Sequence, residues 1–68
     1  MINKVLGFRK MIGLTQEQAA KELGISTNSF ANKEKGRTDF TESEMKRFLH
    51  LVTINVPTVK ITDIFFND

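Results

Sequence analysis

The sequence contains no cysteine, which excludes disulfides, a thiol nucleophile and thiolate metal sites together. With His50 as its single histidine, it cannot assemble a cluster of the familiar transition-metal ligands, so we expect no metal and no cofactor. It also has no glycine-rich phosphate loop, and we expect neither an enzyme nor a small-molecule substrate. No apolar run approaches about 18 residues and no signal peptide is recognisable, so we expect a soluble cytoplasmic protein without a membrane partner.

The 68 residues are enough for one domain, residues 1–68, with a thin core. A chain this short buries only roughly 60% of the surface that it exposes when unfolded. Its charge is uneven: residues 1–37 contain seven basic residues and three glutamates, whereas residues 38–68 contain three basic and five acidic residues. This asymmetry suits a polyanionic partner for the first half, although scattered solvated charges would give the same counts.

Apolar periodicity predicts an all-α bundle of about five short helices. The first spans residues 2–12 and places Val5, Phe8 and Ile12 on one face. Gly7 lies inside this helix, where it is either a point of close packing or an exposed interruption. Gly13 ends the helix.

Two further helices, at about residues 15–23 and 26–35, are separated by little more than a glycine. Thr15 reads as the N-cap of the first, with Gln18 at capping-box spacing. Gly24 suits a left-handed stop, and Ser26 suits the cap of the second helix, whose Phe30 points inward. Helices joined in this way cross at roughly 90–120°, the helix-turn-helix arrangement.

The second half is expected to hold two more helices. Thr41 and Glu44 form another capping-box pattern, although Glu44 also reads as part of a solvated acidic helix start. Residues 50–57 are ambiguous because their β-branched side chains would suit a strand. Pro57 fits the first turn of a closing helix. At its end, three apolar residues form either a candidate partner surface or a folded-back tail: Ile64, Phe65 and Phe66.

The stretch "LTQEQAAKELGIS" resembles the signature of the Cro and phage-repressor family of helix-turn-helix proteins, and "DIFF" is similar to the family's usual closing helix. The resemblance extends over about residues 2–66. It implies a λ-repressor-like fold and binding of a double-stranded DNA operator, with homodimers at least on DNA. Lys33 departs from the pattern, because the family more often has an apolar residue there.

The resemblance also implies residue roles. The family reads bases at the positions of Thr27, Asn28 and Asn32. It contacts the DNA backbone at the positions of Gln16, Lys35, Arg37 and Thr38. Arg9 and Glu34 match a frequent pair that ties the first helix to the recognition helix.

Side-chain chemistry supports these roles independently. Asn can bond adenine N6 and N7 together in the major groove, and the methyl group of Thr can contact a thymine methyl. Ser29 adds a polar group for phosphate, and the stem of Lys33 can cover apolar surface while its amine reaches a phosphate. Gln16 fits a phosphate contact and a plain capping neighbour of Thr15 about equally.

The sequence therefore predicts a sequence-specific DNA-binding transcriptional regulator, a small Cro-like repressor that reads the major groove with residues 26–35. The alternative keeps the fold and changes the class, because fold alone does not determine function. It is an antirepressor or antitoxin-like module whose main partner is another protein, such as a second repressor.

Overall fold

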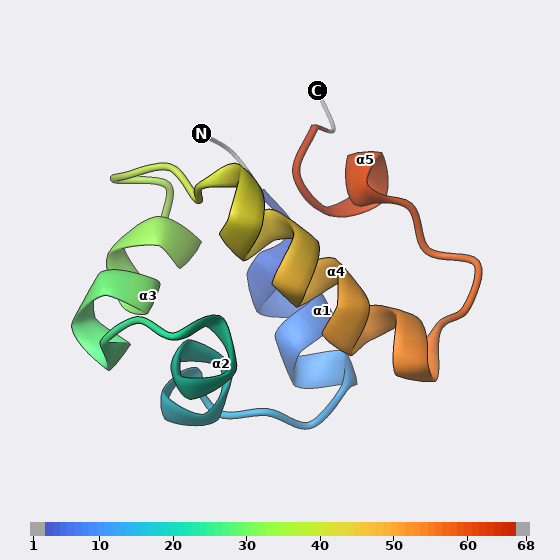
Figure 1. Ribbon diagram of the computed structural model, residues 1–68, viewed down its shortest axis with the longest axis horizontal. Helices are drawn as coiled ribbons and strands as arrows, with labels where there is room; N and C mark the ends of the chain where they lie inside the picture. Colours follow the sequence, from blue (N-terminus) through green and yellow to red (C-terminus); the bar gives the residue numbers. More distant parts are fainter. Residues whose placement is uncertain (1–2, 67–68) are drawn as a thin grey trace.

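The computed structural model describes residues 3–66 and folds them into five α-helices without a strand (Figure 1). The expected all-α bundle of about five helices is therefore confirmed. The helices are α1 (Val5–Met11), α2 (Gln16–Leu23), α3 (Thr27–Glu34), α4 (Glu42–Asn55) and α5 (Ile61–Ile64). Within the described residues, no helix is both long and apolar enough to span a membrane.

Reciprocal side-chain caps begin α2 and α4. The Thr15 hydroxyl accepts from the Gln18 backbone N–H at 3.1 Å, and the Gln18 side chain accepts from the Thr15 N–H at 2.9 Å. Thr41 and Glu44 repeat the arrangement at 3.2 and 2.9 Å. Both boxes satisfy N–H groups that have no partner inside the helix, so these two helix starts follow directly from the local sequence.

Residues 24–26 alone connect α2 to α3. Gly24 adopts a left-handed conformation with φ 76°, which ends α2 as expected for a glycine at this position. The hydroxyl of Ser26 then accepts from the Ser29 N–H at 3.0 Å and begins α3. The two helices are thus joined by a turn too short to let them move independently.

The core lies where α4 runs across α1, with α2 and α3 on one side and α5 on the other (Figure 1). Four phenylalanines meet edge to face in series, with ring centroids 5.8, 5.5 and 6.2 Å apart. The rings in order are Phe30, Phe40, Phe65 and Phe48. This series connects α3 to α4 and to the end of the chain, and α5 also binds α1 through the Lys4 N–H and the Ile64 carbonyl at 2.8 Å.

Some helix boundaries differ from the sequence-based expectation. α1 begins at Val5 rather than residue 2, because the side chain of Asn3 accepts from the Val5 N–H at 3.0 Å. α4 continues to Asn55, so the ambiguous residues 50–55 are helical. The placement of Pro57 in a first helical turn is wrong: it lies in the turn after α4, and α5 begins only at Ile61.

Candidate nucleic-acid interface

Helix α3 has an inner side anchored by one aromatic residue and an outer side of small polar residues. Phe30 is fully buried. Thr27 and Asn28, on the first turn, are exposed, whereas Ser29 and Asn32 are half-buried. The three expected base-reading positions therefore retain solvent access, and in Figure 1 α5 lies on the other side of α4 from this helix.

The loop after α3 presents two cationic side chains. Lys35, Arg37 and Thr38 are exposed, and Gly36 takes a left-handed conformation with φ 83° that turns the chain away from the helix axis. The loop thus places positive charge next to the end of α3. Such a position suits contact with an anionic backbone running past the helix.

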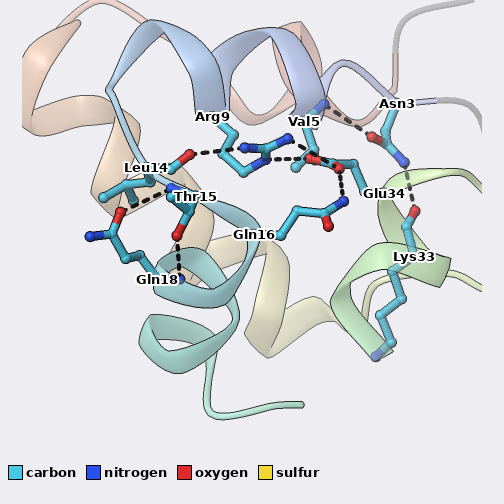
Figure 2. A network of polar contacts seen from close by, with 9 residues as sticks. All are labelled: Asn3, Val5, Arg9, Leu14, Thr15, Gln16, Gln18, Lys33 and Glu34. Atoms are coloured by element: carbon cyan, nitrogen blue, oxygen red, sulfur yellow. Dashed lines mark hydrogen bonds and ion pairs between the residues drawn. The ribbon is translucent and has the colours of Figure 1, made fainter. Parts of the chain in front are cut away.

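The last residue of α3, Glu34, connects three other parts of the protein (Figure 2). Its Oε2 lies 2.7 Å from Arg9 Nε of α1, and both side chains are at least nine-tenths buried. Its Oε1 accepts from the Gln16 side-chain amide of α2 at 2.8 Å. Arg9 in addition donates to the Leu14 carbonyl in the α1–α2 loop at 2.9 Å. The Glu34 carboxylate therefore fixes the end of α3 to α1 and α2, and Arg9 connects this network to the loop between those two helices.

A second contact to the end of α3 comes from the start of the chain. The Asn3 side chain, which caps α1 through its oxygen, donates through its nitrogen to the Lys33 carbonyl at 3.1 Å (Figure 2). That carbonyl belongs to the last turn of α3 and also accepts from the Gly36 N–H at 3.0 Å. Asn3 was not among the residues predicted from the sequence to position α3. It could have been found as an Asn two positions before the start of α1, because Asn side chains often accept from the N–H two residues later.

The structure does not direct Lys33 to the outside, as a phosphate contact would require. Its amine lies 2.6 Å from Glu44 Oε1 of α4, and the two side chains are only 14% and 11% exposed. This corrects two expectations, because Lys33 is engaged within the fold and Glu44 is not a solvated residue. Burial disfavours the charged form of Glu44, but bonds from Lys33 and from the Thr41 N–H outweigh it and lower the pKa of Glu44 below its ordinary value.

Gln16 is half-buried and turned toward Glu34. A side-chain amide carries two N–H hydrogens, and the bond to Glu34 uses one. The second hydrogen remains for an external acceptor. Gln16 is therefore more than a capping neighbour of Thr15, because it also joins α2 to α3.

No protein-family model, curated protein sequence or solved structure matches the chain. The resemblance seen in the sequence therefore remains a prediction.

The candidate partner surface at the end of the chain requires a correction. Ile64 and Phe65 are buried, with 0% and 1% exposure, because α5 packs against α4 and the Phe65 ring lies in the aromatic series. Only Phe66 is exposed, at 54%. Of the three residues expected to form this surface, Phe66 is thus the one that is accessible. The other large exposed apolar residues of the described chain lie on α1 and at the end of α4; they are Leu6, Met11 and Ile54.

An open depression of about 380 Å³ lies between α2 and α4. It is lined by Glu22, Lys46, Arg47, His50 and Leu51. His50 is exposed here, as expected for a surface residue of α4. No residue of α3 lines the depression, so it is separate from the polar outer side of that helix.

Proposed function

We propose that this protein binds double-stranded DNA sequence-specifically by placing α3 in the major groove, and that it acts as a small transcriptional repressor in the cytoplasm. One observation carries the proposal. The exposed side of α3 displays small hydrogen-bonding side chains, while the opposite side and the last turn of the helix are held rigidly by the rest of the fold. A helix held in this way suits the major groove, which is wide enough to admit it.

The residues proposed to read bases are Thr27, Asn28 and Asn32. The two amides can each pair with adenine, and the methyl of Thr27 can contact thymine. The charged residues of α3, Lys33 and Glu34, form ion pairs with other residues of the fold. Because the readers are thus uncharged and include no arginine for guanine, we expect A·T pairs at the centre of each half-site.

The proposed contacts to phosphate surround these readers. Lys35 and Arg37 supply charge and Thr38 and Ser29 supply hydroxyls, while Gln16 can donate its second amide hydrogen to a phosphate oxygen. Lys33 is left out of this set because of its bond to Glu44. These groups would set the position of the protein on DNA without reading its sequence.

A single copy with three readers contacts only a few base pairs. Tight and selective binding therefore requires two copies, arranged as a homodimer on DNA. The two half-sites would be separated by about one helical turn, roughly 34–36 Å. In this scheme, occupancy of the operator by the dimer would itself block transcription.

Selection of binding sites from random duplexes tests the proposal. We expect an enriched, two-fold symmetric sequence, and a titration with that duplex should lose affinity steeply as salt rises, because counterions are released from DNA. The absence of both an enriched sequence and a saturable complex would reject the proposal. It would favour the protein-binding alternative, in which Phe66 is the exposed contact and Phe66→Ser abolishes capture of the partner protein.

A further inference from the structure

The ion pair between Lys33 and Glu44 joins the end of α3 to the start of α4. Lys33 is the penultimate residue of α3, and Glu44 is the third residue of α4. Glu44 Oε1 accepts from the Lys33 amine at 2.6 Å and from the Thr41 N–H at 2.9 Å. The carboxylate that caps α4 is therefore the same group that holds α3.

Stability alone does not account for an ion pair at this place. Taking two charges out of water costs free energy that their attraction barely repays, and apolar pairs of similar volume are often as stable or more so. An apolar contact, however, allows the two surfaces to slide. A hydrogen-bonded pair with a short N–O distance allows little displacement, so this pair restrains geometry where an apolar pair would not.

The geometry it restrains is the rotation of α3 about its own axis. Successive residues of a helix point about 100° apart. Lys33 is bound to α4, whereas its neighbour Glu34 is bound to α1 and α2. Two directional contacts at this angular separation fix the rotation of the helix, which the apolar anchor Phe30 does not fix by itself.

A small rotation would matter for base reading. With side chains extending about 6 Å from the helix axis, a rotation of about 10° moves a side-chain tip by about 1 Å. The donor–acceptor distances of hydrogen bonds span only about 0.5 Å, so such a shift would break a paired contact to a base edge. Contacts from long, flexible lysines to phosphate tolerate the same shift.

We propose that Lys33 and Glu44 form a positioning pair that determines sequence discrimination by fixing the rotation of α3. The inference rests on the proposed DNA-binding function. Neither residue touches DNA in this scheme, and their effect is exerted through Asn28 and Asn32. The pair thus governs which duplexes bind rather than whether DNA binds.

The test uses the double variant Lys33→Met/Glu44→Gln. Methionine keeps the length of the stem, and glutamine retains the acceptor of the capping box. We expect a denaturation midpoint equal to or above that of the wild type. The ratio of affinities for the selected duplex and a scrambled duplex should fall about tenfold, the size of one lost paired base contact. Affinity for the scrambled duplex should stay the same.

The chain supplies a matched control in Lys46→Met/Glu42→Gln. This pair of α4 has a separation of 3.3 Å and exposures of 69% and 80%, and the substitution removes the same two charges. We expect no change in the affinity ratio. A loss equal to that of the first variant would attribute the effect to charge alone and overturn the proposal.

The single variant Glu44→Gln tests the same proposal if the double variant does not fold. It keeps the α4 cap and frees the Lys33 amine, and the affinity ratio should again fall. A full wild-type ratio in a folded variant would reject the positioning role while leaving the DNA-binding proposal intact. A wild-type protein without sequence preference would reject both.

Discussion

Asn28 of α3 and Lys35 of the following loop are both exposed but are expected to contribute differently to DNA binding. Asn28→Ala removes the proposed paired contact to a base. We therefore expect the affinity for the selected duplex to fall by about 1–3 kcal/mol and the affinity for a scrambled duplex to stay unchanged. Lys35→Ala should weaken both complexes and reduce the slope of log K against log salt by about 1 for each protomer. Titrations of both duplexes at several salt concentrations measure these quantities.

Asn32, one turn further along α3, provides the check on this assignment. It is half-buried, so less of its side chain is accessible from outside than that of Asn28. If sequence preference survives both Asn28→Ala and Asn32→Ala, the assignment of base reading to α3 is wrong.

The sequence predicts local contacts of single residues well and distant ones poorly. The caps at Thr15 and Ser26 were predictable because their partners lie three residues away. The partners of Lys33 and Gln16 lie 11 and 18 residues away, in other helices. Periodicity does not specify such pairs, because any charged residue on a neighbouring helix would satisfy the same pattern.

Two glycines of the helical elements should respond oppositely to the same substitution. Gly7 lies in the interior of α1, exposed, with nothing within 4 Å of an added Cβ, so Gly7→Ala should raise the free energy of unfolding by about 1 kcal/mol. Gly24 has a positive φ, and an added Cβ would lie 3.3 Å from an Arg47 nitrogen. Gly24→Ala should therefore lower that free energy by about 1–2 kcal/mol.

Urea denaturation of the two variants measures both changes under one set of conditions. A shift of the same sign in both variants would contradict the distinction between an interior glycine and a left-handed glycine at a helix end. Gly7 also answers the question left open by the sequence, since it is exposed and is not a point of close packing.

The junction between α3 and α4 should be sensitive to acid. Because the folded-state pKa of Glu44 is lowered, its contribution to stability is complete above the unfolded pKa of about 4.5 and is lost as the pH falls through the folded value. We expect the wild type to lose stability below about pH 4.5 more steeply than Glu44→Gln. Thermal melting between pH 3 and 6, about the range in which carboxyl groups titrate, measures the difference.

Glu42→Gln is the control for this titration, because it removes a carboxylate from the same turn of α4 at an exposed position. Its stability should decline with acid in parallel with the wild type. Equal slopes for the wild type and Glu44→Gln would show that the Lys33–Glu44 contact has no energetic weight.

Helix boundaries could be predicted from the sequence where a capping residue was present. The prediction failed where packing against the rest of the fold determines the boundary. Residues 50–55 contain β-branched side chains, yet they continue α4 because Val52 is fully buried and Thr53 donates its hydroxyl to the Leu49 carbonyl at 2.7 Å. Pro57 was expected to begin a helix and instead follows one, where its missing N–H ends the pattern. The burial of Val52 depends on packing against other parts of the fold, which a local pattern does not contain.

The fold of the whole molecule depends on a core that includes its last described helix. We expect Phe65→Ala to lower the free energy of unfolding by about 3–5 kcal/mol, because the ring is buried against Phe40 and Phe48. Phe66→Ala, which alters the exposed neighbour, should stay within about 0.5 kcal/mol. Circular dichroism melts compare the two, and similar losses would contradict the separation of a buried ring from an exposed one.

Core membership was predictable for most of the molecule but not for the link between its halves. Phe40 stands in the loop between α3 and α4, yet it is 3% exposed and joins Phe30 of α3 to Phe65. A single aromatic in a loop carries no periodicity, so its burial emerges only when the helices on either side pack together.

The side chains that anchor α3 and those that it presents are largely different sets. Phe30, Lys33 and Glu34 hold the helix, whereas Thr27 and Asn28 are exposed and make no side-chain hydrogen bond or ion pair identified in the described part of the chain. Thr27 and Asn28 can therefore be substituted without disturbing the contacts that hold α3 in the fold. Under the proposed DNA-binding function, one or two codon changes at these positions would be enough to give the protein a new target sequence. We expect nearly every variant of a library randomised at the same positions to fold.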